Sequence, residues 1–586
     1  MKHLMSGNEA TARGVYEAGI KVCSAYPGTP STEILENLPQ YGKDVYCEWA
    51  PNEKVATEVA YGASVAGSRA FCTMKMVGLN VAADPLFTAG YMGVNGAYVV
   101  VTADDPSCHS SQNEQDNRHY ARAAKIAMVE PSDAQECKDF VRLACEISEE
   151  FDTPVLYRTT TRVCHSKGLV EFGERTEHEA PAYARNTRKF ICTPANAYLN
   201  HPIVEERLVK LAEYGCTRAV ENGLNKVELG DGKVGVITAS ISYQYAKEVF
   251  PEGTSFLKLG LTYPLPMDLI RDFAAKVEKL YVIEELDPFM EDQIKAAGID
   301  CVGKELTGKL YELNTELVRE RVLGIKADYK TIDEVKVAKR PPALCPGCPH
   351  RGFFYTLSKN KSYVVTGDIG CYTLGSAAPL NCMDVCICMG GGFSAGMGMA
   401  KSFQREGVTD KVVFGVMGDS TFFHSGMTGA AEIIYNNGRM IPCVLDNRIT
   451  GMTGHQQNPA TGFDIHGNPA PQLNLEAVCE AVGAHVRVVN PMQMKDMEQA
   501  LREETQRDGV SVIIAHYPCA LLDKRSKQPC TIADCHRCGA CLRLGCPALE
   551  RGADGAVRVN AALCNGCGLC KQMCAFGCIT GGGEKQ

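Results

Sequence analysis

The sequence predicts an α/β protein of several domains that ends in a separate cysteine-rich unit. Its 586 residues are about four times a typical single-domain length of roughly 150. Helix-like and strand-like segments alternate along most of the chain, which is the layout of a parallel sheet covered by helices. Ten of the 29 cysteines lie between Cys530 and the C-terminus. The end of the chain is therefore distinct from the α/β body.

The composition excludes several classes of protein. An apolar fraction of 45% and a charged fraction of 22% are ordinary for a globular protein. A net charge of −9 and a pI near 5.9 disfavour binding to nucleic acid. The start of the chain lacks the apolar stretch of a signal peptide, and no segment has the length of a membrane span. We expect a cytoplasmic protein, whose cysteines bind metal rather than form disulfides.

The first domain is predicted over residues 1–175. Residues 7–20 have the apolar period of a helix, whereas residues 97–103 and 153–160 are β-rich runs bounded by turn formers. A charged, proline-containing stretch at 178–189 follows, and it favours a domain boundary there.

A second α/β domain is predicted over residues 180–335, with strands at 234–240 and 279–285. Two prolines and several turn residues then indicate a linker, so a third domain is predicted over 340–522. Its expected strands are 363–370, 412–419 and 442–447, and its expected helix is 429–438. The cysteine-rich domain takes 525–586.

The tail carries two consecutive cysteine triplets, each followed by a fourth cysteine. A Cys-x2-Cys-x2-Cys turn supplies three thiolates to one cubane, and the remote cysteine crosses to the other cluster. Structural zinc sites are the alternative, because Cys-x2-Cys pairs also bind zinc. The paired pattern favours a ferredoxin domain with two 4Fe-4S clusters, one on Cys535, Cys538, Cys541 and Cys574, and one on Cys546, Cys564, Cys567 and Cys570.

The tail departs from the common ferredoxin pattern in two places. Four residues rather than three separate Cys541 from Cys546, and Cys574 is followed by alanine rather than proline. The longer spacing bears on the geometry and potential of one cluster. Cys530 and Cys578 are left over, and we expect them to be structural thiols.

Gly418-Asp419-Ser420, followed downstream by Asn447, has the layout of a thiamine diphosphate site. A strand ends at Asp419, the next helix presents N–H groups to phosphate, and the next strand ends at Asn447. Mg²⁺ prefers oxygen ligands, which Asp419, the Asn447 amide and the Ile449 carbonyl would supply together with two diphosphate oxygens and a water. An Asp and an Asn at this separation also occur by chance.

Six further segments make the chain resemble the 2-oxoacid:ferredoxin oxidoreductases, and among these the α subunits of the indolepyruvate group. The resemblance spans essentially the whole chain. It implies two thiamine diphosphate-binding-fold domains, pyrimidine-binding (1–175) and diphosphate-binding (340–522), with a transketolase C-terminal-like domain between them and the ferredoxin domain last. The segments are SGNEATARGVYEAGI, AYPGTPSTE, NEKVATEVAYGASVAGSRA, DDPSCHSSQNEQDNR, CPGCPHRG and TGHQQNP.

The resemblance also implies catalytic residues. Glu53 takes the place of the glutamate that bonds N1′ of the aminopyrimidine and favours its imino tautomer. A solvated glutamate at a helix start is the alternative. Thr29 in YPGTPST would lie near the 2-oxo group, and His109 would contribute from DDPSCHSSQ. Pro-Gly-Thr is equally a plain turn, and a single histidine is more often structural.

A third cluster near the thiamine is implied by Cys345, Cys348, Cys371 and Cys519, which match ligand positions of related enzymes. Buried thiols without metal are the competing interpretation. Cys382, Cys386 and Cys388 rank lower as ligands.

The implied reaction is oxidative decarboxylation of arylpyruvates, such as indolepyruvate, with coenzyme A, giving arylacetyl-CoA and CO₂. Electrons would pass one at a time through the clusters to external ferredoxin. The implied partner is a smaller β subunit of the γ-type domain, in an αβ or doubled αβ complex. The alternatives are an oxidoreductase for pyruvate or 2-oxoglutarate, a non-oxidative decarboxylase, which would not need the tail, and an electron-transfer subunit without catalysis, which would not need Glu53 and Asp419.

Overall fold

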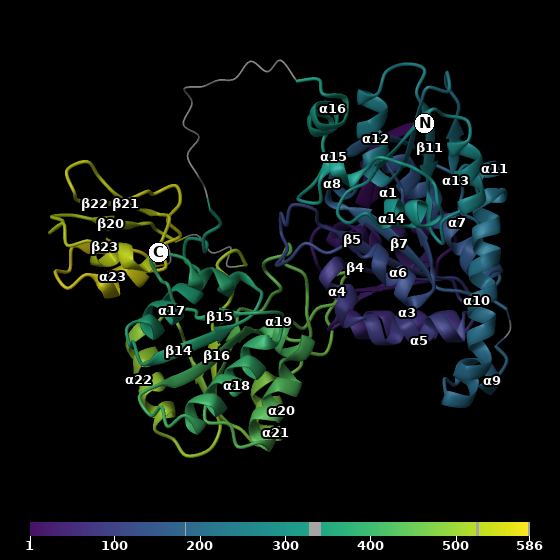
Figure 1. Ribbon diagram of the computed structural model, residues 1–586. Helices are drawn as coiled ribbons and strands as arrows, with labels where there is room; N and C mark the ends of the chain where they lie inside the picture. The colour runs from purple at the N-terminus through teal and green to yellow at the C-terminus, as the bar shows by residue number, and fades with distance from the viewer. Residues whose placement is uncertain (182, 327–340, 523–526, 584–586) are drawn as a thin grey trace. The chain divides into compact units, whose positions relative to one another are not determined.

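The computed structural model describes residues 1–181, 183–326, 341–522 and 527–583. The chain forms two compact units, Met1–Asp333 and Glu334–Gln586 (Figure 1), and each is described by itself. Among the described residues, no helix is long and apolar enough to cross a bilayer. The domain limits expected at 335, 340 and 525 lie outside the described residues, and the four domain ranges stay predictions.

The first unit is built on a seven-stranded sheet in the order β12-β6-β7-β5-β4-β2-β3. Its pairs are parallel except that β12 runs antiparallel to β6. The central strand β5 is buried along its whole length, as expected for a parallel strand. The strands are β2 (Val22–Ala25), β3 (Tyr46–Trp49), β4 (Ala70–Lys75), β5 (Tyr98–Asp104), β6 (Ala127–Val129), β7 (Val155–Thr160) and β12 (Leu261–Tyr263).

Helices alternate with these strands. The first begins at a capping box, in which the Glu9 N–H donates to Ser6 Oγ at 3.2 Å and the Ser6 N–H donates to the Glu9 carboxylate at 2.7 Å. It confirms the helix predicted over 7–20. An antiparallel pair, β1 (Lys2–Ser6) with β8 (Lys167–Glu171), lies beside it. The helices are α1 (Gly7–Glu17), α2 (Thr32–Glu36), α3 (Glu53–Val65), α4 (Met76–Val81), α5 (Ala83–Met92), α6 (Arg118–Ala124), α7 (Ala134–Glu150) and α8 (Thr161–His165).

A smaller four-stranded sheet, ordered β13-β10-β11-β9, follows in the same unit. Only β9 is antiparallel to its neighbour. The strands predicted at 234–240 and 279–285 are confirmed as β10 and β13. The elements are α9 (Thr187–Phe190), α10 (Pro194–Cys216), α11 (Arg218–Glu221), β9 (Lys226–Glu228), β10 (Val234–Ala239), α12 (Ser240–Val249), β11 (Ser255–Leu259), α13 (Met267–Ala274), β13 (Lys279–Ile283), α14 (Phe289–Ala296), α15 (Lys304–Thr307) and α16 (Thr315–Leu323).

The second unit contains a parallel six-stranded sheet in the order β15-β14-β16-β17-β19-β18. The three strands and the helix predicted for this part of the chain are confirmed as β14, β16, β17 and α20, with ends shifted by a few residues. The elements are α17 (His350–Ser358), β14 (Tyr363–Gly367), β15 (Val385–Cys386), α18 (Gly391–Arg405), β16 (Val412–Gly418), α19 (Asp419–Thr421), α20 (Met427–Tyr435), β17 (Ile441–Asp446), α21 (Leu475–Ala481), β18 (His485–Val489), α22 (Met494–Thr505) and β19 (Ser511–His516).

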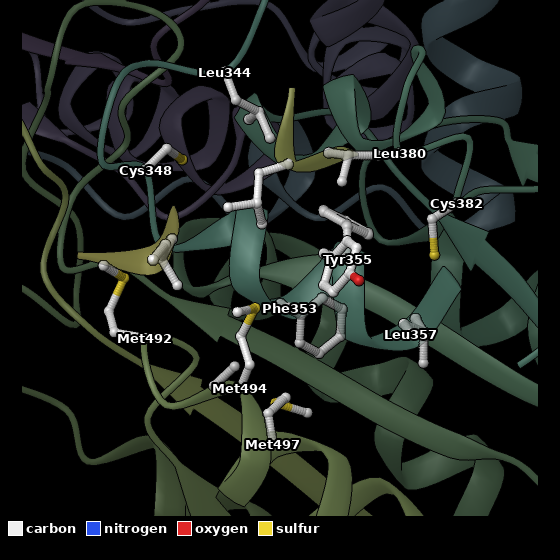
Figure 2. Packing of buried hydrophobic residues seen from close by; sticks show 14 of the residues in the cluster. Leu344, Cys348, Phe353, Tyr355, Leu357, Leu380, Cys382, Met492, Met494 and Met497 are labelled. Carbon is white, nitrogen blue, oxygen red and sulfur yellow. The ribbon is translucent and has the colours of Figure 1, made fainter. Parts of the chain in front are cut away.

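The cysteine-rich tail packs onto this unit through a shared apolar cluster. Phe353 of α17, Met494 of α22 and Leu569 of the tail belong to it. Figure 2 shows Met494 beside Phe353. The Gln572 amide donates to the Met492 carbonyl at 2.8 Å. The tail's elements are β20 (Cys530–Ile532), η4 (Ala540–Leu544), β21 (Leu549–Arg551), β22 (Val557–Val559), α23 (Leu569–Met573) and β23 (Ile579–Gly581).

Buried ionic groups join the two sheets of the first unit. Arg118 of α6 pairs at 2.5 Å with Glu284, which follows β13. Beside it, Glu285 accepts a hydrogen bond from the Leu313 N–H at 2.9 Å. Burial raises the pKa of Glu285 to about 7, although this hydrogen bond and Arg158 act in the opposite direction. Between about pH 4.5 and 7, the native state therefore keeps a proton on Glu285 that the unfolded chain has released.

The stability of the first unit should accordingly decrease as the pH rises. The native pKa of Glu285 lies above the unfolded value of 4.5. The contribution of Glu285 to the free energy of unfolding is therefore complete below pH 4.5 and is lost as the pH rises through about 7. Glu285→Gln cannot ionise and keeps its acceptor oxygen. Between about pH 4.5 and 7 it should gain stability relative to the parent protein, by up to about 1.4 kcal/mol per pH unit, and above about pH 7 the difference should stay constant. Urea unfolding measures this, with exposed Glu213→Gln as the control; identical pH profiles for parent and Glu285→Gln would contradict it.

Candidate active site

The carboxyl ends of β16 and β17 bring together the residues predicted to bind a metal ion and a diphosphate. The strands are parallel neighbours, with Gly418 in register with Leu445. Asp419 follows β16, Asn447 follows β17, and both side chains are buried. Ile449, two residues beyond Asn447, is also buried. The fold thus gathers this predicted set at one edge of the sheet.

The surroundings of Asp419 suit a divalent cation. The Asn458 amide donates to Asp419 Oδ2 at 3.2 Å, and within the described part of the chain Asp419 forms no ion pair. Burial, and then the charge of Asp446, raise the pKa of Asp419 to about 7. A cation would offset this cost of burial. The oxygens of Asp419, Asn447 and Ile449 are of the type that Mg²⁺ prefers, so the residues fit a magnesium ion.

A second buried carboxylate, Asp368 at the end of β14, was missed from the sequence. The Tyr372 hydroxyl donates to Asp368 Oδ1 and lies 3.0 Å from Thr421 Oγ1, and the Gly390 N–H donates to Asp368 Oδ2 at 3.0 Å. A Cβ on Gly418 would lie 2.7 Å from the Tyr372 ring, so only glycine fits there. This network fixes the turn where α19 begins. The signal available in the sequence was an aspartate within the strand predicted over 363–370.

In the first unit, Glu53 opens α3 beyond the carboxyl end of β3. Asn52 caps this helix by accepting the Val55 N–H at 2.8 Å. The Glu53 side chain is buried. Gly78 of α4 makes room for it, because an added Cβ would lie 2.7 Å from Glu53 Cγ. Glu53 is therefore held by packing, unlike the solvated glutamate that was the alternative.

Thr29 follows β2 at the same edge of the sheet and is half-buried. Its carbonyl accepts a hydrogen bond from Ser110 Oγ at 3.3 Å, and Lys75 Nζ donates to the Ser110 carbonyl at 2.8 Å. Burial lowers the pKa of Lys75, while the charges of Asp105 and Glu53 act in the opposite direction. Sequence reasoning missed this lysine, whose signal was a cation at the end of a buried strand.

His109 lies in the loop after β5 but is exposed. Its Nε2 lies 3.2 Å from Glu312, which also pairs with Arg162 at 2.5 Å. His109 thus contacts a carboxylate at the surface, and its contribution to catalysis stays a prediction.

The tail gathers its cysteines into the two predicted groups, each around a small cavity. Burial raises the pKa of Cys541, and the thiols of Cys538, Cys535 and Cys574 act in the same direction. Burial likewise raises the pKa of Cys567 to about 11, with Cys546 among the thiols that add to it. The longer spacing before Cys546 therefore still brings it to its partners.

Each of these cavities has a fifth cysteine in its wall. Cys530 lines the cavity of Cys546, Cys564, Cys567 and Cys570, and its N–H donates to Cys564 Sγ at 3.4 Å. Cys578 lines the other cavity, and its thiol donates to the Asp534 carbonyl at 3.3 Å. Sequence spacing alone gave no sign of either position.

The four cysteines of the proposed third centre also lie together. Burial raises the pKa of Cys371 to about 11, and the thiols of Cys519 and Cys345 act in the same direction. Burial also raises the pKa of Cys348, to which Cys371 and Cys345 contribute. Cys382 belongs to the apolar cluster of the unit, as Cys348 does, and Cys386 and Cys388 are exposed, as Cys345 is.

Comparisons with known proteins agree with these observations. Residues 13–210 match the family described as pyruvate flavodoxin/ferredoxin oxidoreductase, thiamine diP-bdg, and residues 368–515 match the thiamine pyrophosphate enzyme, C-terminal TPP binding domain. The chain is 41% identical to indolepyruvate oxidoreductase subunit IorA of Archaeoglobus fulgidus, over 98% of this chain and 96% of the relative. It is 38% identical to subunit IorA of Pyrococcus horikoshii, with the same coverage. The chain belongs to the IorA family.

Membership of the IorA family confirms the resemblance and the fold class predicted from the sequence. The protein is an oxidoreductase, a thiamine diphosphate-dependent 2-oxoacid:ferredoxin oxidoreductase. A solved structure, 2-oxoglutarate:ferredoxin oxidoreductase from Magnetococcus marinus with 2-oxoglutarate, coenzyme A and succinyl-CoA bound, is 18% identical, with a TM-score of 0.46, and covers 55% of this chain and 65% of its own.

Replacing Gly78 tests the position of Glu53. Gly78→Ala should lower kcat at least about tenfold, because its Cβ would displace Glu53 Cγ, and a misplacement of about 1 Å is costly in catalysis. The matched control is Gly62→Ala in α3, where an added Cβ meets nothing within 4 Å. That control should keep kcat and gain up to about 1 kcal/mol of stability. Unchanged kcat in Gly78→Ala would contradict a catalytic role that depends on the position of Glu53.

Replacing Asp419 tests the metal site. Asp419→Asn removes the charged ligand, so Mg²⁺-dependent binding of thiamine diphosphate should weaken at least about tenfold, as measured by calorimetry. The chain without cofactor should be no less stable than the parent, because the variant removes a buried carboxylate. Exposed Asp410→Asn is the control. Equal affinity in the Asp419→Asn variant would exclude Asp419 as a ligand.

Proposed function

We propose that the protein catalyses the oxidative decarboxylation of arylpyruvates, with indolepyruvate as the substrate. Coenzyme A would take up the acyl group to give arylacetyl-CoA and CO₂, and ferredoxin would take up the electrons. Six relatives named indolepyruvate oxidoreductase subunit IorA, between 37% and 41% identical over nearly the whole chain, support this substrate.

The observation that carries the oxidative part of the proposal is one hydrogen bond. The Cys519 N–H donates to the Asn447 carbonyl at 2.9 Å, so a cysteine of the proposed third centre is fixed to the loop that would bind magnesium. Cys371 lies beside Cys519, in the turn after Asp368. A cluster bound by these thiols would lie next to the cofactor and could accept its electrons directly. A non-oxidative decarboxylase has no use for such an arrangement.

The roles of the site residues follow from their chemistry. Thiamine diphosphate, when bound, stabilises the carbanion left by decarboxylation. Asp419, Asn447 and Ile449 would hold Mg²⁺ against its diphosphate. Glu53 would accept a hydrogen bond at N1′ of the pyrimidine and so favour the imino tautomer. Thr29 would lie near the 2-oxo group, and Gly418 and Ser420 would frame the diphosphate turn.

The three cysteine groups of the second unit suggest the order of electron transfer. Pro346 and Gly347, between Cys345 and Cys348, also line the cavity of Cys546, Cys564, Cys567 and Cys570. We therefore place that cluster second, and the cluster of Cys535, Cys538, Cys541 and Cys574 last. The last cluster would deliver electrons to ferredoxin.

The α-type naming of the relatives further supports a complex with a smaller β subunit of the γ-type domain. We propose an αβ or doubled αβ assembly.

The activity test is an anaerobic assay of the purified complex with coenzyme A and a viologen dye. Indolepyruvate should reduce the dye with a higher kcat/KM than pyruvate or 2-oxoglutarate. A preference for either of those acids would overturn the arylpyruvate assignment. Failure to reduce the dye with any 2-oxo acid would overturn catalysis by this complex.

Iron analysis tests the number of clusters. The parent chain should hold about twelve iron atoms, and Cys519→Ser should lose about four of them because a cubane needs its fourth thiolate. Buried Cys443→Ser, whose thiol lies in the apolar cluster of the unit, is the control and should lose none. About eight iron atoms in the parent would restrict the chain to the two tail clusters.

A further inference from the structure

Arg351 joins the loop of Cys345 and Cys348 to the loop that carries Cys546. It lies in the segment CPGCPHRG, at the start of α17, and is only 2% exposed. Its Nε donates to the Cys345 carbonyl at 3.1 Å, and its Nη1 donates to the Leu544 carbonyl at 2.9 Å. Its remaining nitrogen, Nη2, donates to the Leu344 carbonyl.

These contacts give each nitrogen of the guanidinium one carbonyl acceptor, but they do not balance its charge. Among the described residues, no carboxylate hydrogen-bonds or forms an ion pair with Arg351. Burial lowers the pKa of Arg351, and the nearby thiols of Cys546, Cys348, Cys345 and Cys567 act in the opposite direction. A buried cation without an anion is costly, by several kcal/mol in general. The side chain is placed where anionic centres on both sides would remove that cost.

We propose that Arg351 is an electrostatic bridge between two iron-sulfur clusters, the one at Cys345, Cys348, Cys371 and Cys519 and the one at Cys546, Cys564, Cys567 and Cys570, and that it raises the reduction potential of both. The inference rests on the proposed function, since it requires those clusters. Arg351 touches neither the substrate nor the thiamine, so it is a positioning residue that acts through the clusters.

The direction of the effect follows from charge. Each cluster gains one negative charge when it takes up an electron, and a fixed positive charge close by stabilises the reduced form more than the oxidised form. Arg351 lines the cavity of the second cluster, whereas the wall of the cavity at Cys535, Cys538, Cys541 and Cys574 does not include it. The outermost cluster therefore serves as an internal reference.

The test is a redox titration of the full chain, purified anaerobically and monitored by electron paramagnetic resonance. Cys538→Ser and Cys564→Ser identify which signals belong to the two tail clusters. Arg351→Met should make the reduction of the two inner clusters about tenfold less favourable, a shift of about 59 mV to lower potential for one electron. The outermost cluster should keep its midpoint. Arg351→Lys, which keeps the charge, should restore most of the shift.

Two controls separate charge from packing. Arg543→Met removes an exposed arginine of η4 and should leave all midpoints unchanged. Unfolding by urea is also compared with and without clusters. The stability that the chain gains on loading with iron and sulfide should be smaller in Arg351→Met than in the parent, because only the parent then neutralises a buried charge. This comparison also covers the case in which Arg351→Met loads poorly.

The outcomes are distinct. Unchanged midpoints in Arg351→Met, an equal shift in all three clusters, or an equal gain of stability on loading would each overturn the bridge. A parent chain that binds no iron would overturn the proposed function together with this inference, and iron analysis shows that before any titration. A chain with iron only in the tail would overturn the inner half of the bridge while leaving the ferredoxin domain in place.

Discussion

Parallel pairing of β14, β16, β17 and β19 is the constraint on which the second unit depends. Neighbouring parallel strands end at the same edge of a sheet, so the residues that follow them must lie close together. Asp368, Asp419, Asn447 and Cys519 each follow one of these strands or its first turn. They are far apart in the sequence, yet one set of backbone hydrogen bonds brings the residues of the proposed magnesium site close to Cys519 of the proposed third cysteine centre.

Within the part of the chain that the structure describes, buried charge without a partner of opposite charge is found at two of the proposed functional residues of this unit. Asp419 has a pKa raised to about 7 by burial, and Arg351 is buried among carbonyls and thiols. Neither arrangement stabilises the folded chain by itself, because a charge in a low-dielectric interior is costly. Each becomes favourable beside a group of opposite charge, a divalent cation for Asp419 and anionic clusters for Arg351. On the proposed function, the protein would hold these side chains in place ahead of binding, at some cost in stability.

The cysteine-rich tail is part of the core of its unit. Its leucines share an apolar cluster with α17 and α22, and Arg351 bonds to its Leu544 carbonyl. A domain attached only by a linker could move relative to the sheet and vary the distance between centres. Shared packing instead fixes the cavity of Cys546, Cys564, Cys567 and Cys570 against the Cys345–Cys348 turn. Such a fixed arrangement suits transfer of electrons along a defined route.

The sequence by itself determined the fold class, the main strands and the grouping of the tail cysteines. These follow from local patterns: the helical and strand periods, and the fixed spacing of Cys-x2-Cys-x2-Cys turns. It also pointed to Asp419 and Asn447, because residues that end predicted strands can be read in order along the chain. Glu53 was available only through the resemblance to a family, since a glutamate at a helix start has many uses.

Only the tertiary structure decided which residues support these sites and how. Asp368, Lys75, Cys530 and Arg351 gain their roles from contacts with residues distant in the sequence, and no period or spacing encodes such contacts. The surface contact of His109 with Glu312 is of the same kind, because it depends on a loop from the smaller sheet domain reaching the larger one. Burial, which sets the cost of each charge, is a property of the packed chain and not of the local sequence.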